Sequence, residues 1–172
     1  MNARRILMAV IAVLAVIQFI PAVHDNPPVV DPIVFADPNA EAIARTACYD
    51  CHSNETVWPW YAYVAPFSWY TISHVNEGRA ELNFSDIAGT IAGARAQQAH
   101  IVYAEEEGEG GEGGEGGEGG NSAAEISEEV AETINDGEMP PAYYTLMHRD
   151  AVLSAQQKAI LIAGIRQALA QR

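Results

Sequence analysis

The chain has 172 residues and a formal net charge of −14, because 23 Asp and Glu residues outnumber 9 Lys and Arg residues. Proteins bind nucleic acids through Lys and Arg at the phosphates, so this composition argues against a nucleic-acid partner. The only two cysteines, Cys48 and Cys51, cannot form the disulfide framework of a small secreted domain.

The N-terminal segment, residues 1–23, is predicted to be a membrane anchor. Arg4 and Arg5 precede an apolar run from Ile6 to Val23, which Gln18 alone interrupts with a polar side chain. As a helix this run is about 27 Å long, close to the hydrocarbon thickness of a bilayer. A cleavable signal peptide is the alternative, but no clean Ala-x-Ala cleavage site follows. The arginines predict a cytoplasmic N-terminus on the bacterial inner membrane, with the rest of the chain in the periplasm.

The next segment, residues 24–36, contains prolines and shows no periodic pattern, which predicts an extended stalk that lifts the domain off the bilayer. Asp37 and Pro38 then predict a helix start, as N-cap and first helical residue. This first helix of the domain is expected to continue to about residue 49.

The remaining chain is predicted to contain several short helices joined by long loops, with one insertion. Helices are expected over residues 67–82, over 86–104, from residue 121 or 122 to Gly137, and from the capping box of Ser154 and Gln157 onward. Residues 105–120 are Glu and Gly only, so they have no apolar group to bury and are predicted to be a flexible insertion. No segment alternates between apolar and polar residues. Residues 37–172 are therefore predicted to form one all-α domain.

The strongest motif is Cys48-Tyr49-Asp50-Cys51-His52, whose Cys-x-x-Cys-His spacing is typical of covalent haem attachment. Two thiols about one helical turn apart can each add to one porphyrin vinyl group, and His52 can then supply the proximal imidazole of the iron. A redox-active cysteine pair, a structural zinc site and a plain disulfide are the alternatives. The first needs a βαβ context and the second usually has another ligand pair, and neither is present. We predict one covalently bound haem c.

The sixth iron ligand is predicted to be Met139. Pro140 and Pro141 follow it and stiffen an extended loop that can hold the thioether sulfur against the iron. His74, His100, Met147 and His148 are the other candidates for this ligand.

Four further side chains are predicted to contact the haem. Arg79 and Asn83 could neutralise or hydrogen-bond the propionates, although a surface ion pair and a turn are equally compatible with these two residues. Trp58 and Trp60 belong to an aromatic cluster, part of which should form an apolar wall against the porphyrin.

Further motifs accompany the attachment signature. They are Cys48-Tyr49-Asp50-Cys51-His52-Ser53, Thr56-Val57-Trp58-Pro59-Trp60-Tyr61, Ala65-Pro66-Phe67-Ser68-Trp69, His74-Val75-Asn76-Glu77-Gly78-Arg79, Leu82-Asn83-Phe84-Ser85, and Met139-Pro140-Pro141 with Tyr144. In these motifs the chain resembles the bacterial haem-binding domain family of c-type cytochrome-like proteins over most of residues 37–170. The resemblance implies a cytochrome c-like helical fold around one haem, behind an N-terminal transmembrane helix. It also implies attachment at Cys48 and Cys51, with His52 as proximal and Met139 as distal ligand.

These patterns together predict a membrane-anchored monohaem c-type cytochrome that transfers electrons in the periplasm and is not an enzyme. Its expected partners are redox proteins of a respiratory chain, which the anchor would keep at high effective concentration. The alternative is a haem-based gas sensor or peroxidase-like enzyme with an open or displaceable sixth ligand site.

Overall fold

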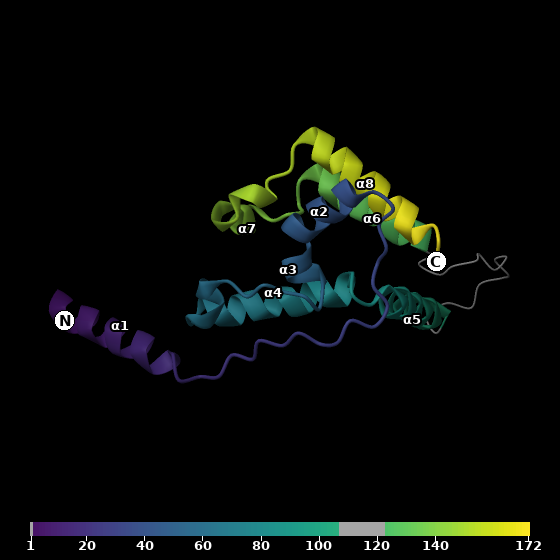
Figure 1. Ribbon diagram of the computed structural model, residues 1–172. Helices are drawn as coiled ribbons and strands as arrows, with labels where there is room; N and C mark the ends of the chain where they lie inside the picture. Colours follow the sequence, from purple (N-terminus) through teal and green to yellow (C-terminus); the bar gives the residue numbers. More distant parts are fainter. Residues whose placement is uncertain (1, 107–122) are drawn as a thin grey trace.

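The computed structural model describes residues 2–106 and 123–172, and these are largely helical (Figure 1). The elements are α1 (Ala3–Ile17), α2 (Pro38–Ala47), α3 (Tyr49–His52), η1 (Trp60–Tyr63), α4 (Phe67–Glu81), α5 (Ile87–Glu106), α6 (Ala123–Asp136), α7 (Ala142–Met147), η2 (Arg149–Ala151) and α8 (Ala155–Leu169). Within the two described ranges there is no β-strand, and Asp31 and Asp86 form an isolated bridge. The all-α prediction is confirmed.

The helix ends follow from local chemistry that the sequence already contains. The Asp37 carboxylate accepts a hydrogen bond from the Asn39 amide at the start of α2, and Pro38 is the first helical residue. Ser154 forms the predicted capping box with Gln157 at the start of α8. At the end of α6, Gly137 adopts a φ of 79°, a conformation that glycine reaches without steric cost.

The end of the first helix of the domain differs from the prediction. The first helix of the domain ends at Ala47 instead of near residue 49, because Cys48 leaves the helical conformation with a φ of −125°. A separate short helix, α3, then carries Cys51 and His52. The attachment motif therefore begins with Cys48 at the break between α2 and α3 and continues through the single turn of α3.

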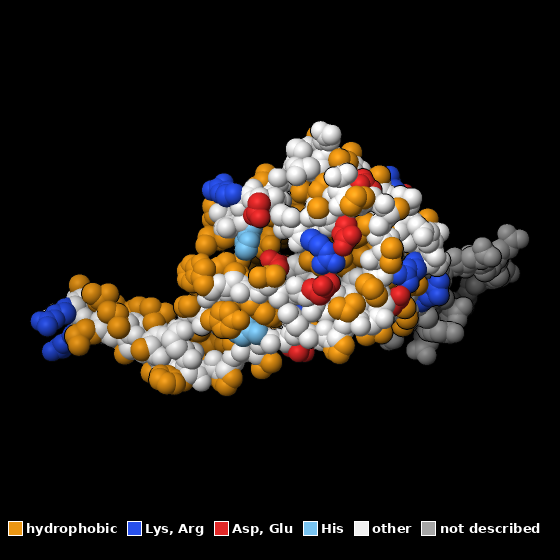
Figure 2. Space-filling model, in the orientation of Figure 1, with side chains coloured by type: hydrophobic (Ala, Val, Ile, Leu, Met, Phe, Trp, Pro, Cys, Tyr) orange, Lys and Arg blue, Asp and Glu red, His pale blue; other side chains and the backbone are white. Residues whose placement is uncertain are grey.

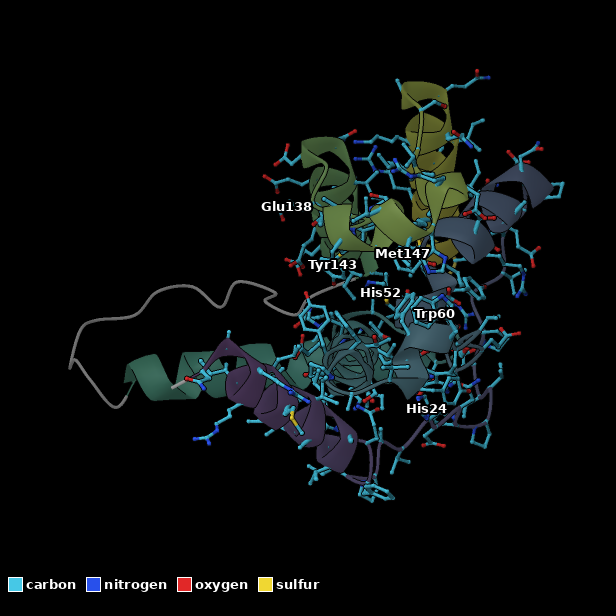
Figure 3. All side chains as sticks on the ribbon, turned by 90° about the vertical axis from the view of Figure 1, so that its left-hand side faces the viewer. His24, His52, Trp60, Glu138, Tyr143 and Met147 are labelled. Carbon is cyan, nitrogen blue, oxygen red and sulfur yellow. The ribbon has the colours of Figure 1, made fainter. Side chains whose placement is uncertain are left out.

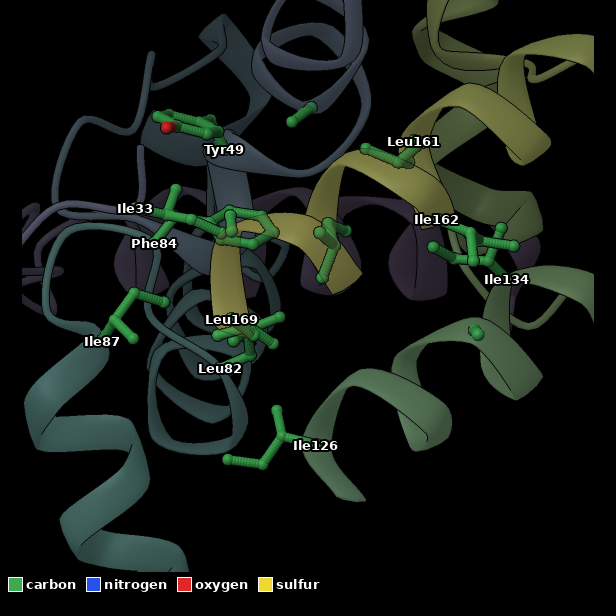
Figure 4. Packing of buried hydrophobic residues seen from close by; sticks show 14 of the residues in the cluster. Ile33, Tyr49, Leu82, Phe84, Ile87, Ile126, Ile134, Leu161, Ile162 and Leu169 are labelled. Carbon is green, nitrogen blue, oxygen red and sulfur yellow. The ribbon is translucent and has the colours of Figure 1, made fainter. Parts of the chain in front are cut away.

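The hydrophobic core forms where α8 packs on α2 and α6 (Figure 4). Leu161, Ile162 and Leu169 of α8 are buried, and Ile134 of α6 packs in the same cluster. Gly164 lets α8 approach α2 closely, because a Cβ at this position would clash with the Ala40 side chain. Burying these apolar side chains is the main force that stabilises this part of the domain.

The N-terminal helix is shorter than predicted. A helix over residues 6–23 was expected, but α1 ends at Ile17, where Gln18 begins a turn and Pro21 prevents the helix from continuing. None of the side chains of α1 is buried, and α1 projects away from the domain (Figure 1). Among the described residues, no helix is both long and apolar enough to cross a membrane. The predicted transmembrane helix is thus not supported.

The predicted stalk, residues 24–36, is extended, but it lies against the domain instead of standing apart from it. Ile33 is only 6% exposed and belongs to the core, and its amide donates to the Phe84 carbonyl at 2.8 Å. The Asn54 side chain also donates to the Pro28 carbonyl. Backbone hydrogen bonding and the buried Ile33 side chain explain why this segment packs on the domain and does not stand free as predicted. The flexible insertion predicted at residues 105–120 falls almost wholly outside the described residues.

Candidate functional site

The attachment motif occupies one helical turn. The amides of Cys51 and His52 both donate to the Cys48 carbonyl, at 3.1 and 2.9 Å. Cys48 and Cys51 are free thiols, and each is half-buried. Burial raises the pKa of the Cys48 thiol to about 12 and that of the Cys51 thiol to about 11, so both are neutral at physiological pH. The structure therefore brings the three predicted haem residues together.

A close approach of α4 holds α3 in place. Gly78 of α4 is buried against α3, and a Cβ at this position would lie 2.8 Å from the Cys51 carbonyl oxygen. Real Cβ atoms do not come this near to a backbone oxygen, so only glycine fits here without moving one of the helices.

The His52 ring is oriented by the backbone at the end of α4. Its Nδ1 lies 3.0 Å from the Leu82 carbonyl oxygen, and because a carbonyl can only accept, Nδ1 donates. The other ring nitrogen, Nε2, then keeps its lone pair, and histidines that ligate metals are held in this way. Burial lowers the His52 pKa and favours the neutral imidazole, while the Leu82 hydrogen bond opposes this shift.

A cavity of about 730 Å³ opens beside the motif, between α3 and α4 on one side and α7 on the other. Figure 3 shows Tyr143 and Met147 of α7, Trp60 of η1, and His52 around this region. Its lining is mostly apolar and aromatic: Asp50, Cys51, Thr56, Pro59, Trp60, Tyr61, Val64, Pro66, Phe67, Tyr70, Thr71, His74, Val75, Tyr143, Tyr144, Leu146 and Met147. Cys51 thus places a thiol in the wall of a cavity that suits a large apolar ligand.

Two tyrosine hydroxyls hold α7 over the cavity. Tyr144 donates to the Asp50 carboxylate at 2.8 Å, and Asp50 also accepts from the Val57 amide at 3.0 Å. Tyr61 shares a hydrogen bond of 2.8 Å with Nε2 of His148, whose ring stacks on that of Tyr144. Burial and the adjacent Asp50 charge raise the pKa of Tyr144, so its hydroxyl stays protonated and keeps donating.

The structure separates the two predicted tryptophans. Trp60 lines the cavity, as expected for an aromatic wall. Trp58 does not line it and instead packs edge-on against His24, with ring centroids 4.8 Å apart.

Arg79 was predicted to contact a propionate, but its guanidinium forms hydrogen bonds that connect two loops of the domain. Its guanidinium donates to the carbonyls of Ser53 and Asp25, to the Asn26 side chain and to the Thr56 hydroxyl. These contacts join the 24–36 segment to the chain that follows α3, and Arg79 does not line the cavity.

Asn83, the other predicted propionate ligand, is engaged in a turn. Its amide donates to the Asn54 side chain at 2.9 Å, and its oxygen accepts from the Ser85 amide at 2.9 Å. The turn role that the sequence also allowed for Asn83 is the one that the structure shows.

The structure does not place Met139 in the cavity wall. Its side chain is 37% exposed, and Pro140 and Pro141 connect it to the start of α7. Two of the alternative ligands, His74 and Met147, do line the cavity. His74 lies on α4, where its Nδ1 hydrogen-bonds to the Tyr70 carbonyl at 3.0 Å.

Sequence reasoning missed several cavity residues. It assigned no haem contact to the four tyrosines that line the cavity, Tyr61, Tyr70, Tyr143 and Tyr144. Their clustering just after the attachment motif and just after Met139 was a usable signal, because aromatic side chains commonly line pockets for flat cofactors. Nothing in the sequence indicated that Asp50 pairs with Tyr144.

The chain was also compared with known proteins. The family model of the haem-binding domain matches residues 12–112 and 116–167. The chain belongs to the haem-binding domain family. No curated protein and no solved structure gives a significant match. Membership of the haem-binding domain family confirms the prediction that the chain binds haem.

The observed site fits the ligand of this haem-binding domain. The cavity volume lies within the range of about 300–1,000 Å³ that is usual for cofactor and ligand sites. Its lining is apolar, one attachment thiol lies in its wall, and the adjacent His52 is held by its other ring nitrogen. In the described part of the chain, no three His, Cys, Asp or Glu side chains gather into a group that could hold a bare metal ion.

Proposed function

We propose that the chain is a membrane-tethered monohaem c-type cytochrome that carries electrons on the periplasmic side of the bacterial inner membrane. One observation carries the proposal. In a haem-binding domain, Cys51 lines an apolar cavity one residue before His52, whose imidazole is oriented by the Leu82 carbonyl.

Covalent attachment at Cys48 and Cys51 is the proposed mode of haem retention. The two thiols lie on one helical turn, which is the spacing that two vinyl groups of one porphyrin require. Both are free and neutral, and α4 holds their short helix in place through the contact at Gly78. A rigid α3 would present both thiols and His52 in a constant geometry.

Haem supplies a one-electron iron couple, and the residues of the chain set its surroundings. His52 would be the proximal ligand, and its bond to Leu82 fixes the ring and strengthens the donor nitrogen. The aromatic walls exclude water, which is one of the ways in which proteins tune a haem potential.

A methionine thioether is the proposed sixth ligand, with Met139 as the leading residue. The Met-Pro-Pro loop leads directly into α7, which lines the cavity. Met147 lies in the cavity wall and is the nearest rival on structural grounds. Thioether ligation would stabilise ferrous iron and suit an electron carrier that performs no catalysis.

Membrane tethering is proposed from the surface of α1. None of its apolar side chains is buried, most are exposed, and Arg4 and Arg5 lie at its outer end. An exposed apolar helix with basic residues at one end is typical of a segment that enters a membrane or its interface. The tether would keep the domain close to redox partners of a respiratory chain.

The test is spectroscopy of the full chain, matured in a bacterial host with a working cytochrome c assembly system. We expect a pyridine haemochrome spectrum of haem c and a pigment that resists acid–acetone extraction. The double variant Cys48→Ala with Cys51→Ala should release its pigment under the same treatment. A colourless wild-type chain, or one whose pigment is extracted, would overturn covalent attachment.

A second candidate function is a haem-based gas sensor or peroxidase-like enzyme. The observation that favours it is the absence of Met139 from the cavity wall, which is compatible with an open or displaceable sixth site. Rapid, tight binding of carbon monoxide by the reduced wild-type protein would support this function. Slow binding, accelerated by loss of the methionine, would support the carrier.

A further inference from the structure

One long segment of the domain contains no formally charged side chain. Residues 57–76 contain no Asp, Glu, Lys or Arg, although the whole chain has a net charge of −14. They form η1 and most of α4, the part of the domain beside the cavity. Residues 6–24, which include most of α1, are also free of these four residue types.

These two uncharged segments are fixed to each other. The Gln18 side chain donates to the Ala65 carbonyl and accepts from the Ala65 amide, both at 3.0 Å. His24 donates from Nε2 to the Ala62 carbonyl at 2.7 Å, and its ring stacks on Tyr63 at 4.2 Å. The chain that follows α1 is therefore anchored on the uncharged segment 57–76 of the domain.

Large apolar side chains are exposed around this junction. Phe19 is 87% exposed, Val23 72% and Tyr63 61%, and Ile20 and Trp69 are exposed as well. None of these five side chains lines the large cavity, so a ligand in that cavity would leave them uncovered. We call them the junction patch. In Figure 2 hydrophobic atoms continue from α1 onto the adjoining end of the domain.

The cavity wall and the junction patch share one segment of the chain. Trp60, Phe67 and Tyr70 line the cavity, and Tyr63 and Trp69 of the junction patch lie in the same uncharged segment. Figure 3 views the molecule from the side on which α1 projects, and α1 lies in front of the domain.

We propose that the surface formed by α1 and the junction patch rests on a lipid bilayer, with α1 inserted in the membrane and the junction patch at the level of the headgroups. The inference rests on the proposed function, because tethering brings this surface to the membrane. Trp and Tyr are the side chains enriched at that level, where one part of the ring is apolar and another is hydrated. Segments without acidic side chains also avoid repulsion between an acidic protein and anionic lipids.

The test is hydroxyl-radical footprinting, read by mass spectrometry, of the full-length holoprotein with and without vesicles. The vesicles contain phosphatidylcholine with some phosphatidylglycerol. We expect vesicles to slow the oxidation of Phe19, Tyr63 and Trp69 several-fold. Met8 of α1 reports tethering itself. Val34, 66% exposed, is the control, because its neighbours Ile33 and Phe35 pack in or against the core. Its oxidation should not change.

The other possible footprinting results would contradict either the proposed tether or the proposed contact of the junction patch with lipid. Protection of Met8 without the junction patch would overturn the inference and leave the tether intact. No protection anywhere would overturn the proposed tether and this inference together. Protection without vesicles that grows with protein concentration would show that a second copy covers this surface instead. As an independent check, Tyr63→Asp should lower the fraction of protein bound to vesicles, and the matched control Val34→Asp should not.

Discussion

The position of the attachment helix depends on the missing side chain of Gly78. A single methyl group there would press on the Cys51 carbonyl, between two elements that both carry haem-site residues. Overpacking of this kind usually costs about 1–3 kcal/mol, because backbone has to move.

We therefore expect Gly78→Ala to lower the free energy of unfolding by about that amount and to reduce covalent haem incorporation. Chemical denaturation and the haem-to-protein absorbance ratio measure the two effects. The matched control is Gly93→Ala in α5, where an added Cβ would meet nothing within 4 Å. The control should stabilise the protein slightly, since alanine favours helix more than glycine. Equal behaviour of the two variants would refute the role of Gly78.

Single substitutions can identify the sixth iron ligand. We expect Met139→Ala to abolish the near-infrared methionine-to-iron band of the oxidised protein and to lower the reduction potential, because ferrous iron loses its thioether donor. Met147→Ala and His74→Ala are the matched comparisons, since both of these residues line the cavity. Loss of the band in Met147→Ala alone would move the ligand assignment to Met147.

At the scale of elements, α7 is held over the cavity by side-chain hydrogen bonds more than by burial. None of its residues is buried, and Tyr144 reaches across to Asp50 on α3. A short helix fixed in this way can adjust its position over a bound ligand more easily than a core helix.

Tyr144→Phe should therefore lower the free energy of unfolding by about 1.5–3 kcal/mol, because the hydroxyl that donates to a charged carboxylate is lost. Tyr61→Phe, which breaks only the hydrogen bond to the His148 ring, is expected to cost about 0.5–1.5 kcal/mol. Thermal unfolding of the holoprotein measures both variants. A larger loss in Tyr61→Phe would contradict this account of how α7 is held.

In the whole molecule, the stability of the domain does not depend on α1. No residue of α1 is buried, and the core residues lie between Ile33 and Leu169. The principal contact that fixes the end of α1, between Gln18 and Ala65, involves a residue that follows the helix.

A chain that begins at Gln18 should therefore retain the haem spectrum and nearly the full melting temperature of the wild type. It should lose binding to vesicles, since the exposed apolar helix is gone. Calorimetry and vesicle sedimentation check the two expectations. A large fall in melting temperature would show that α1 contributes to the stability of the domain.

Local chemistry determined the helix ends and the attachment turn. The Asp37 cap, the Gly137 stop and the capping box at Ser154 were all predictable, because each interaction spans only a few residues. The grouping of Cys48, Cys51 and His52 followed in the same way, from residues within one helical turn.

Long-range contacts decided what the sequence could not. Residues 24–36 resemble a free stalk in composition, yet Ile33 enters the core and Asn54 binds the Pro28 carbonyl. Arg79 and Asn83 carry groups suited to propionates, but their donors are taken by backbone and side chains distant in sequence. Similarly, only the packing of α4 and α7 against α3 created the cavity and chose its tyrosines. Hydrogen-bond partners and cavity walls depend on which distant segments meet, and a pattern along the chain does not contain that information.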